Sequence, residues 1–585
     1  MQSENQRTLE GLGSKEDIQK SDSWGNVSKD SKNNEKNAEY FAKKQKEISI
    51  AEFFEKNRHL LGFDSKRKVL LTAVKEAVDN SLDACEEARI LPELKISLIQ
   101  MSSKRFRVIV EDNGPGIVKK QMPKIFGKLL YGSKFHSMKQ HRGQQGIGIS
   151  AVALYGQLTT GKPIKITSKI ASSDRAFYCE LFLDTTKNEP QILKDDVVDS
   201  SKDHGTKIEI ELEGSYYQGS QSVDEFIKQV AIVNPHVNIT YVNPKAEYLT
   251  FARATETLPV ESKEIKPHPY GIEVGTLAKM LSSSTHKTLV SFLKNEFSRV
   301  SAAVADEILT KASILPETDP KSLDLNQVHL IINAIRDTKI MAPPVDCLSP
   351  IGEKSLELGL KKEVNAEFYC VTSRSPSVYS GNPFIIEVGF AYGGNLPKDS
   401  SAAVLRFANK VPLLYQAGAC ALTKSVLATN WKRYSMMQPK GSLPIGPLVI
   451  LIHIASVWVP YTNEAKEAVA NYDEIIKEVK LSFQELGRKL NKYVNKKKNV
   501  KDELLKRDFI AKFIPYISES LREILGFPEE KEKELNLNLA KILEKKRGTI
   551  DTMEFDESSN QDYDENLKLK VKGGIVDDFY NEDES

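Results

Sequence analysis

The chain has 585 residues, 40% of them hydrophobic and 28% charged, a composition that excludes both a wholly disordered protein and a single small domain. Its longest apolar run covers residues 448–459, which is shorter than the roughly 20 residues that a membrane helix needs, and it contains a histidine. Residues 1–20 lack the apolar core of a secretory signal and the five cysteines are scattered, so we expect a cytoplasmic protein without membrane spans or structural zinc.

Charge is distributed unevenly along the chain, although the net charge is only +2. Residues 551–585 contain 12 Asp and Glu against 3 Lys, a net charge of −9, so the preceding residues carry +11. We expect a disordered acidic tail over 551–585 and, because residues 1–45 have almost no aliphatic side chains, a disordered arm there. The basic remainder is typical of a protein that binds a polyanion, although evenly scattered, solvated lysines would give the same charge.

The first folded block, residues 46–266, shows the alternating helices and strands of an α/β domain. Apolar residues recur at helical spacing from Ile48, and the spacing changes to two at Phe106, Val108 and Val110. Strands bounded by Gly, Ser or Asp turns are predicted at 104–111, 164–169, 177–182 and 206–212.

Three further blocks follow the first. Residues 267–345 show helical spacing only, between prolines, which predicts a small helical module. Residues 346–508 have the pattern of a second α/β domain, and residues 509–550 that of a C-terminal helical region. The elements predicted in the second α/β domain are strands near 384–390 and 448–459 and a long helix that begins near Glu464.

A polar stripe marks the helix predicted over residues 70–83. Its apolar residues form one face, while Glu76, Asn80 and Asp83, at spacings i, i+4 and i+7, form a second face that is wholly polar. Taken alone, such a face is more often a solvent-exposed edge than a site.

Two glycine-rich turns follow this helix. Asp112 ends a buried strand and precedes Gly114 and Gly116, which allow backbone to approach a flat ligand, and a buried carboxylate needs a hydrogen-bond donor. The loop 143–148 (GQQGIG) opens a helix, where unpaired backbone N–H groups and the helix dipole favour phosphate. Alone, this loop is also typical of a flexible turn.

Four motifs in this order resemble those of the GHKL ATPase superfamily. They are the E-x-x-x-N helix, the D-x-G-x-G turn, the G-x-x-G-x-G loop and the Gly205-Thr206 pair before a strand. The resemblance implies an α/β sandwich that binds ATP and Mg²⁺. Glu76 would activate the attacking water, Asn80 would ligate Mg²⁺ and Asp112 would accept the adenine amino hydrogen. It implies further ATP contacts from Gly114, Gly116, Ser133, Lys134, Gly143, Gln144, Gln145, Gly146, Ile147, Gly148, Ile149 and Thr206.

The remainder of the chain resembles the B subunit of DNA topoisomerase VI, a type IIB topoisomerase. The similar segments are 268–277, 406–415 and 430–434, and the resemblance extends over residues 47–545. It implies a GHKL ATPase domain, a helix-two-turns-helix module and a transducer domain that carries the long helix. It also implies duplex DNA as a partner, a separate DNA-cleaving A subunit, ATP-dependent dimerisation, an A2B2 heterotetramer and association with the nucleoid.

In this family a transducer lysine enters the ATP site from the loop after a buried strand. Lys466 is the first lysine after the strand predicted at 448–459, so the resemblance assigns it that role. A cation that contacts the γ-phosphate links nucleotide state to domain angle. The alternatives are that Lys466 is a solvated residue or that Lys440, which precedes the strand, has the role.

A short aromatic and basic segment is the candidate DNA contact. Trp431, Lys432, Arg433 and Tyr434 resemble part of the transducer and are expected to grip DNA, although such a segment alone is more often a half-buried packing patch. The basic run 488–507 either follows phosphates or forms a solvated helix face.

The two resemblances together imply an ATP-hydrolysing topoisomerase subunit that closes a dimer clamp on duplex DNA and drives strand passage with a separate cleaving subunit. No metal-binding cleavage domain is readable after the transducer. The alternative is a GHKL-fold DNA-binding scaffold without strand passage, and the intact Glu76, Asn80 and Asp112 argue against it. A sensor kinase would need a phosphoacceptor helix, which the sequence does not show.

Overall fold

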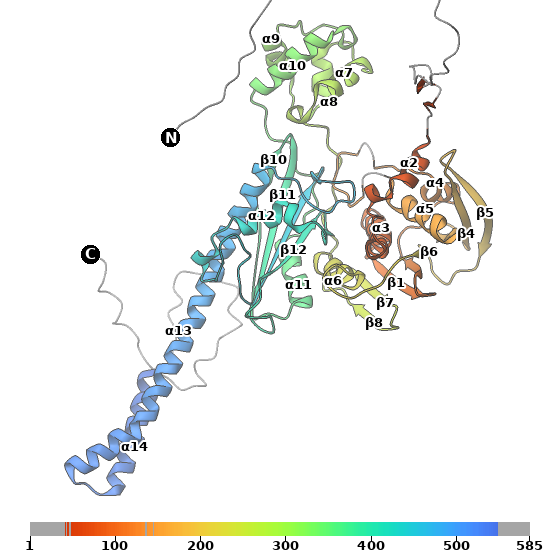
Figure 1. Ribbon diagram of the computed structural model, residues 1–585. Coiled ribbons are helices and arrows are strands. Elements are labelled where there is room, and N and C mark those ends of the chain that lie inside the picture. The colour runs from red at the N-terminus through yellow and green to blue at the C-terminus, as the bar shows by residue number, and fades with distance from the viewer. Residues whose placement is uncertain (1–40, 43, 46–47, 135–136, 144–145, 548–585) are drawn as a thin grey trace, which may run out of the picture. The chain divides into compact units, whose positions relative to one another are not determined.

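The computed structural model describes residues 41–42, 44–45, 48–134, 137–143 and 146–547 (Figure 1). The expected acidic tail and nearly all of the expected N-terminal arm therefore lie outside the described residues. The chain divides into two compact units, residues 1–48 and 49–585. In the first unit, Phe41, Ala42 and Lys44 are helical. Within the described part of the chain, no helix combines the length and the hydrophobicity needed to cross a membrane.

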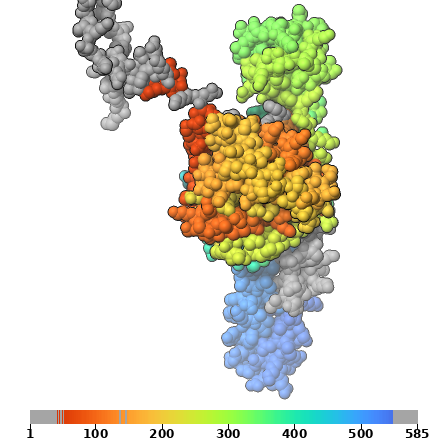
Figure 2. All heavy atoms as spheres, turned by 90° about the vertical axis from the view of Figure 1, so that its right-hand side faces the viewer, coloured from red at the N-terminus to blue at the C-terminus, as the bar shows by residue number. Residues whose placement is uncertain are grey.

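The first α/β region is built on an eight-stranded sheet of order β5-β4-β3-β6-β2-β1-β7-β8, in which only the β1–β7 pair is parallel. Its strands are β1 (Glu93–Gln100), β2 (Arg105–Glu111), β3 (Ile164–Lys169), β4 (Ala176–Asp184), β5 (Glu189–Val198), β6 (Gly205–Glu213), β7 (Asn238–Val242) and β8 (Tyr248–Phe251). The period-two pattern that predicted β2 is confirmed, because Phe106, Val108 and Val110 are buried. The atoms of this region, orange to yellow, form a continuous surface in Figure 2.

Helices pack on this sheet and complete its hydrophobic core. They are α2 (Ile50–Lys56), α3 (Lys66–Glu87), α4 (Met122–Gly127), α5 (Gly148–Thr160) and α6 (Val223–Val233). Helix α3 begins after Ser65, whose side chain accepts a hydrogen bond from the Lys68 N–H. It packs against β2 and α5, so its polar stripe lies beside the loop that opens α5. The predicted α/β sandwich is confirmed.

A separate hydrophobic core holds the helical module. Its helices are α7 (Val274–Ser282), α8 (Leu289–Glu296), α9 (Ala302–Ala312) and α10 (Leu325–Asp337), and this fully described stretch contains no strand, as the spacing predicted. Thr288, Ser301 and Asp324 cap three of these helices with side-chain oxygens.

The second sheet has the order β10-β11-β14-β12-β13, with β9 also paired to β11. Its strands are β9 (Phe368–Ser373), β10 (Ser377–Tyr379), β11 (Asn382–Tyr392), β12 (Ala403–Ala408), β13 (Val411–Pro412) and β14 (Leu448–Ser456). Strand β14 is buried along its whole length, which explains why its sequence is apolar except for His453 and Ser456. The helices that pack here are α11 (Glu353–Glu363), α12 (Ala421–Leu427) and the first part of α13 (Asp473–Leu525).

The long helix α13 begins at Asp473, so the predicted start near Glu464 is wrong. Lys466 has φ +54, a left-handed conformation that a helix cannot contain, and the Asn463 side chain accepts from the Glu467 N–H in place of a helical carbonyl. Residues 457–472 therefore form a loop. Helix α13 then runs through Pro515, and α14 (Glu529–Arg547) packs against it (Figure 1).

Candidate nucleotide site

A cavity of about 660 Å³ lies between α3, the end of β2, the start of α5 and the loop that follows β14. It brings together segments that are far apart in sequence. The predicted site residues that line it are Glu76, Asn80, Asp112, Gly116, Ser133, Lys134, Gly143, Gly146, Ile147, Gly148, Ile149, Thr206 and Lys466. Gly114 does not line the cavity, and Gln144 and Gln145 lie outside the described residues.

Asp112 is buried at one end of the cavity and is held by three donors. Ser81 Oγ donates to its Oδ2 at 2.7 Å, and the N–H groups of Gly114 and Thr206 donate to its Oδ1 at 2.9 and 3.1 Å. Burial raises the pKa of Asp112, although these hydrogen bonds act to lower it. A carboxylate offers about four lone-pair positions, so one remains on Oδ2 for a donor on a ligand.

Two glycines allow the close approaches that shape the site. Gly116 has φ +78, and a Cβ built on it would lie 2.0 Å from the Lys169 carbonyl oxygen. A Cβ on Gly148 would lie 1.8 Å from Glu76 Oε2. The first helical turn of α5 and the Glu76 carboxylate therefore share space that only glycine leaves open.

Glu76 is held by two cations inside the site. Lys75 Nζ lies 3.1 Å from its Oε1. Burial alone would raise the pKa of Glu76, but Lys75 and Lys466 outweigh it and lower the pKa below its usual value. Next to it, burial raises the pKa of Asp79 to about 6 although Lys75 lies 3.7 Å away. The carboxylate facing the glycine loop is thus the one whose pKa is lowered, so it is ionised at neutral pH, as a general base requires.

Asn80 is the candidate metal ligand. Its side-chain oxygen lies 3.8 Å from the position of a Cβ on Gly143, so it faces the glycine loop across the cavity. No cluster of three or more His, Cys, Asp or Glu that could bind a metal occurs among the described residues. This arrangement fits Mg²⁺, which is commonly held by one or two protein oxygens together with substrate phosphates and water.

Lys466 reaches the site from the loop after β14. Its Nζ donates to the Arg142 carbonyl oxygen at 3.0 Å, and burial lowers its pKa although Glu76 opposes the change. The alternative, Lys440, is exposed and does not line the cavity. The structure therefore brings Lys466 and not Lys440 to the start of the glycine loop.

Lys134 lies at the cavity wall but is already paired with a side chain. Its Nζ is 2.6 Å from Asp83 Oδ2, and Arg142 Nη1 donates a hydrogen bond to Oδ1 of the same carboxylate at 2.9 Å. Against the effect of burial, these two cations lower the pKa of Asp83 to about 2. The sequence predicted Asp83 on the polar stripe, but it did not indicate its pairing with Lys134 and Arg142 or the role of Lys75.

The segment Trp431–Tyr434 corrects one prediction. Trp431 is 0% exposed, donates from Nε1 to the Val426 carbonyl and packs against Phe390 and Phe483. Tyr434 is 9% exposed and packs on Gly487 of α13. These two rings belong to a hydrophobic core, so the prediction that they contact DNA is wrong for this structure.

Lys432 and Arg433, in contrast, are exposed. They point to the solvent from a short 3-10 helix that lies against α13, and their contact with DNA stays a prediction.

Two family models match separate parts of the chain. The model described as histidine kinase-, DNA gyrase B- and HSP90-like ATPase matches residues 65–215, which contain α3 and the glycine loop. The model described as topoisomerase VI B subunit, transducer, matches residues 343–506, which contain the second sheet.

Relatives match nearly the whole chain. The B subunit of type 2 DNA topoisomerase 6 from Methanococcoides burtonii is 48% identical over 93% of this chain and 86% of its own length. The B subunits of the same enzyme from Methanosarcina acetivorans and Archaeoglobus fulgidus are 50% and 48% identical, each over 86% of this chain and 81% and 82% of their own lengths. From these matches, and from a nucleotide-type cavity bordered by both matched regions, the chain belongs to the family of type 2 DNA topoisomerase 6 B subunits.

Proposed function

We propose that this chain is the ATP-binding and ATP-hydrolysing subunit of a type IIB topoisomerase. The observation that carries the proposal is the single cavity in which Glu76, Asn80, Asp112 and the glycine loop meet Lys466 from the second sheet. A site built from both regions can respond to the nucleotide by changing the angle between them.

ATP fits the two ends of the cavity. The remaining lone pair of Asp112 would accept the adenine amino hydrogen, and Thr206, whose N–H already orients that carboxylate, would lie beside the ring. The triphosphate would lie at the N-terminus of α5, where N–H groups and the helix dipole stabilise negative charge. The backbone N–H groups around Gly146 and Gly148 supply these donors.

Hydrolysis would use the ionised Glu76 to orient a water and take its proton as it attacks the γ-phosphate. Asn80 would hold Mg²⁺, which supplies charge neutralisation on the phosphates. Lys466 would contribute a positive charge beside Glu76, and this charge both keeps Glu76 ionised and stabilises negative charge on the substrate.

The partners follow from family membership and from the charge distribution. Two copies would join through their ATPase regions around duplex DNA, and a separate A subunit would cut DNA within an A2B2 assembly associated with the nucleoid. Lys432, Arg433 and the basic run 488–507 of α13 support contact with phosphates.

The test is ATPase activity with and without duplex DNA, followed by relaxation of supercoiled DNA when a family A subunit is added. Glu76→Ala should keep binding of a non-hydrolysable ATP analogue and lose hydrolysis by about 10²-fold or more, the scale of a positioned base. An active ATPase that never supports relaxation would favour the DNA-binding scaffold. Full turnover in Glu76→Ala would remove that residue from its role.

A further inference from the structure

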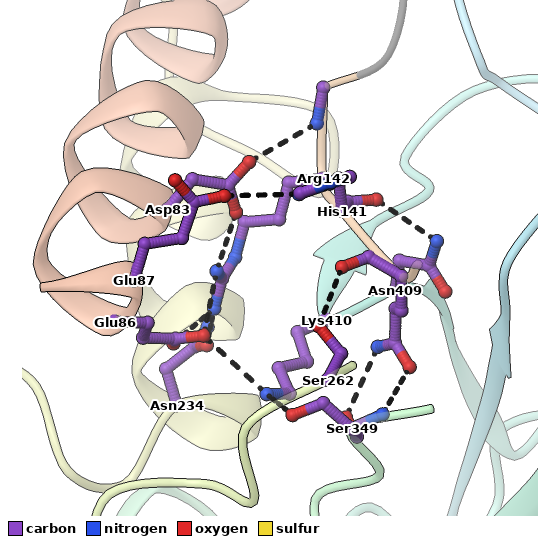
Figure 3. A network of polar contacts seen from close by, with 12 residues as sticks. Asp83, Glu86, Glu87, His141, Arg142, Asn234, Ser262, Ser349, Asn409 and Lys410 are labelled. Carbon is purple, nitrogen blue, oxygen red and sulfur yellow. Dashed lines mark hydrogen bonds and ion pairs between the residues drawn. The ribbon is translucent and has the colours of Figure 1, made fainter. Parts of the chain in front are cut away.

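A chain of buried charges runs from the nucleotide cavity to the second sheet (Figure 3). Helix α3 contributes two carboxylates, Asp83 and Glu86. Arg142 lies between them and donates to both, with Nη1 at 2.9 Å from Asp83 Oδ1 and Nη2 at 2.6 Å from Glu86 Oε1. Lys134 at the cavity wall ends the chain on one side, and Lys410 ends it on the other, 3.6 Å from Glu86 Oε2.

Lys410 is 3% exposed, an uncommon place for a lysine. Its Nζ donates to Ser349 Oγ at 3.0 Å in addition to its contact with Glu86. Burial lowers the pKa of Lys410, and Glu86 opposes that change. The ATP mechanism proposed above does not use this residue, so its burial has another cause.

The backbone that presents Lys410 is held in an unusual conformation. Asn409 and Lys410 link β12 to β13 with φ +48 and +66, and two consecutive left-handed residues that are not glycine are costly. His453 accepts from the Lys410 N–H at 2.9 Å and is itself held by Glu387, which lies 2.8 Å from its other ring nitrogen. Because Nε2 must accept from an amide, the ring proton is on Nδ1 and is donated to the carboxylate.

The tip of this turn contacts the segment that leads into the glycine loop. Asn409 Nδ2 donates to the His141 carbonyl at 3.0 Å, and one residue further on, the Arg142 carbonyl accepts from Lys466. One residue earlier, the Gln140 amide exchanges two hydrogen bonds with the Ser349 backbone, at 2.7 and 3.1 Å. Three consecutive residues are thus bonded to the second region, immediately before Gly143.

We propose that the Asn409–Lys410 turn positions Arg142, and with it the start of the glycine loop, for ATP hydrolysis. Lys410 is then a positioning residue that acts through Glu86, a second connection between the two regions besides Lys466. The inference rests on the proposed ATPase function. Its physical basis is that Glu86 orients the Arg142 guanidinium with two bonds, and Lys410 lies 3.6 Å from Oε2, one of the two Glu86 oxygens that accept them.

The test uses the full chain and compares Lys410→Met with Lys410→Arg. Lys410→Met should lower kcat about tenfold or more, the scale of one charge-assisted contact, while affinity for a non-hydrolysable ATP analogue changes by less. Lys410→Arg, which keeps the charge, should recover most of the activity. The matched control is Lys361→Met, which removes an exposed lysine of α11 that pairs only with Glu357 among its described ion pairs.

A double variant separates positioning from general stability. Lys410 acts on Arg142 through Glu86, so Lys410→Met combined with Glu86→Gln should lose much less activity than the product of the two single losses. Asn409→Gly tests the turn independently, since glycine keeps the left-handed backbone and removes the bond to His141 together with two bonds to the Ser456 backbone. Its kcat should fall as well.

The outcomes are distinct. If the unmodified protein has no ATPase activity, the proposed function fails. If it is active and both Lys410→Met and Asn409→Gly retain its kcat, or if Lys410→Met lowers only the melting temperature, the positioning role is overturned and the ATPase assignment stands. Multiplicative losses in the double variant would also overturn it.

Discussion

Replacing Gly148 by alanine would test whether the position of Glu76 matters, because the new methyl group would enter the space of its carboxylate. The added Cβ would lie 1.8 Å from Glu76 Oε2, and contacts below 3.0 Å are not tolerated, so the oxygen has to move by about 1.2 Å. Displacing a reacting group by about 1 Å can cost about 10²-fold in rate, which corresponds to roughly 2.7 kcal/mol in activation free energy. The obstructing atom ends a flexible side chain, so the fold itself should tolerate the change.

The assay compares kcat, the melting temperature and analogue affinity for Gly148→Ala. We expect kcat to fall about 10²-fold with an unchanged or slightly raised melting temperature, because alanine favours a helix over glycine. Gly275→Ala on α7 is the matched control, since a Cβ there meets no atom within 4 Å. Unchanged kcat in Gly148→Ala would show that hydrolysis does not depend on the placement of Glu76.

Three further variants probe other parts of the site. Asp112→Asn should weaken ATP binding, because an amide cannot accept from all three present donors and from adenine; unchanged ATP and GTP affinities would refute the adenine placement. Lys466→Ala should bind ADP normally but lose about ten- to a hundredfold in preference for ATP analogues. The acid limb of the pH–rate profile of Lys466→Ala should move to higher pH, because one of the two cations that lower the Glu76 pKa is gone. An unmoved limb would show that Lys466 does not influence the ionisation of Glu76. Neutralising Lys432 and Arg433 together should reduce the slope of log K for DNA against log salt by about one per lost phosphate contact, and an unchanged slope would exclude them as contacts.

Local patterns predicted much of the first sheet and of the cavity. Strand β3 has the predicted bounds, and β2, β4 and β6 differ from prediction by one or two residues at an end. Each site motif is short and lies within one element or at its end, so its spacing could be recognised without knowledge of the fold. The resemblance to the B subunit family is confirmed by the relatives.

What sequence could not supply depends on contacts between distant residues. Nothing near Glu86 indicates that Arg142, 56 positions later, and Lys410 both bind it. Trp431 has the local sequence of an exposed basic patch, yet the rings of Phe390 and Phe483 bury it. In both cases the decisive partner comes from another element, and tertiary packing overrides the local pattern.

Helix α13 has a mechanical consequence for any change at the nucleotide cavity. Its buried residues before Leu490 fix it to the second sheet, while most of its remaining length is exposed. At 1.5 Å per residue its 53 residues span about 80 Å, so a tilt of the sheet by about 10° would displace the far end by about 14 Å. A contact change of a few ångströms beside Lys466 that tilted the sheet would thereby be amplified into a much larger displacement at the far end of the helix.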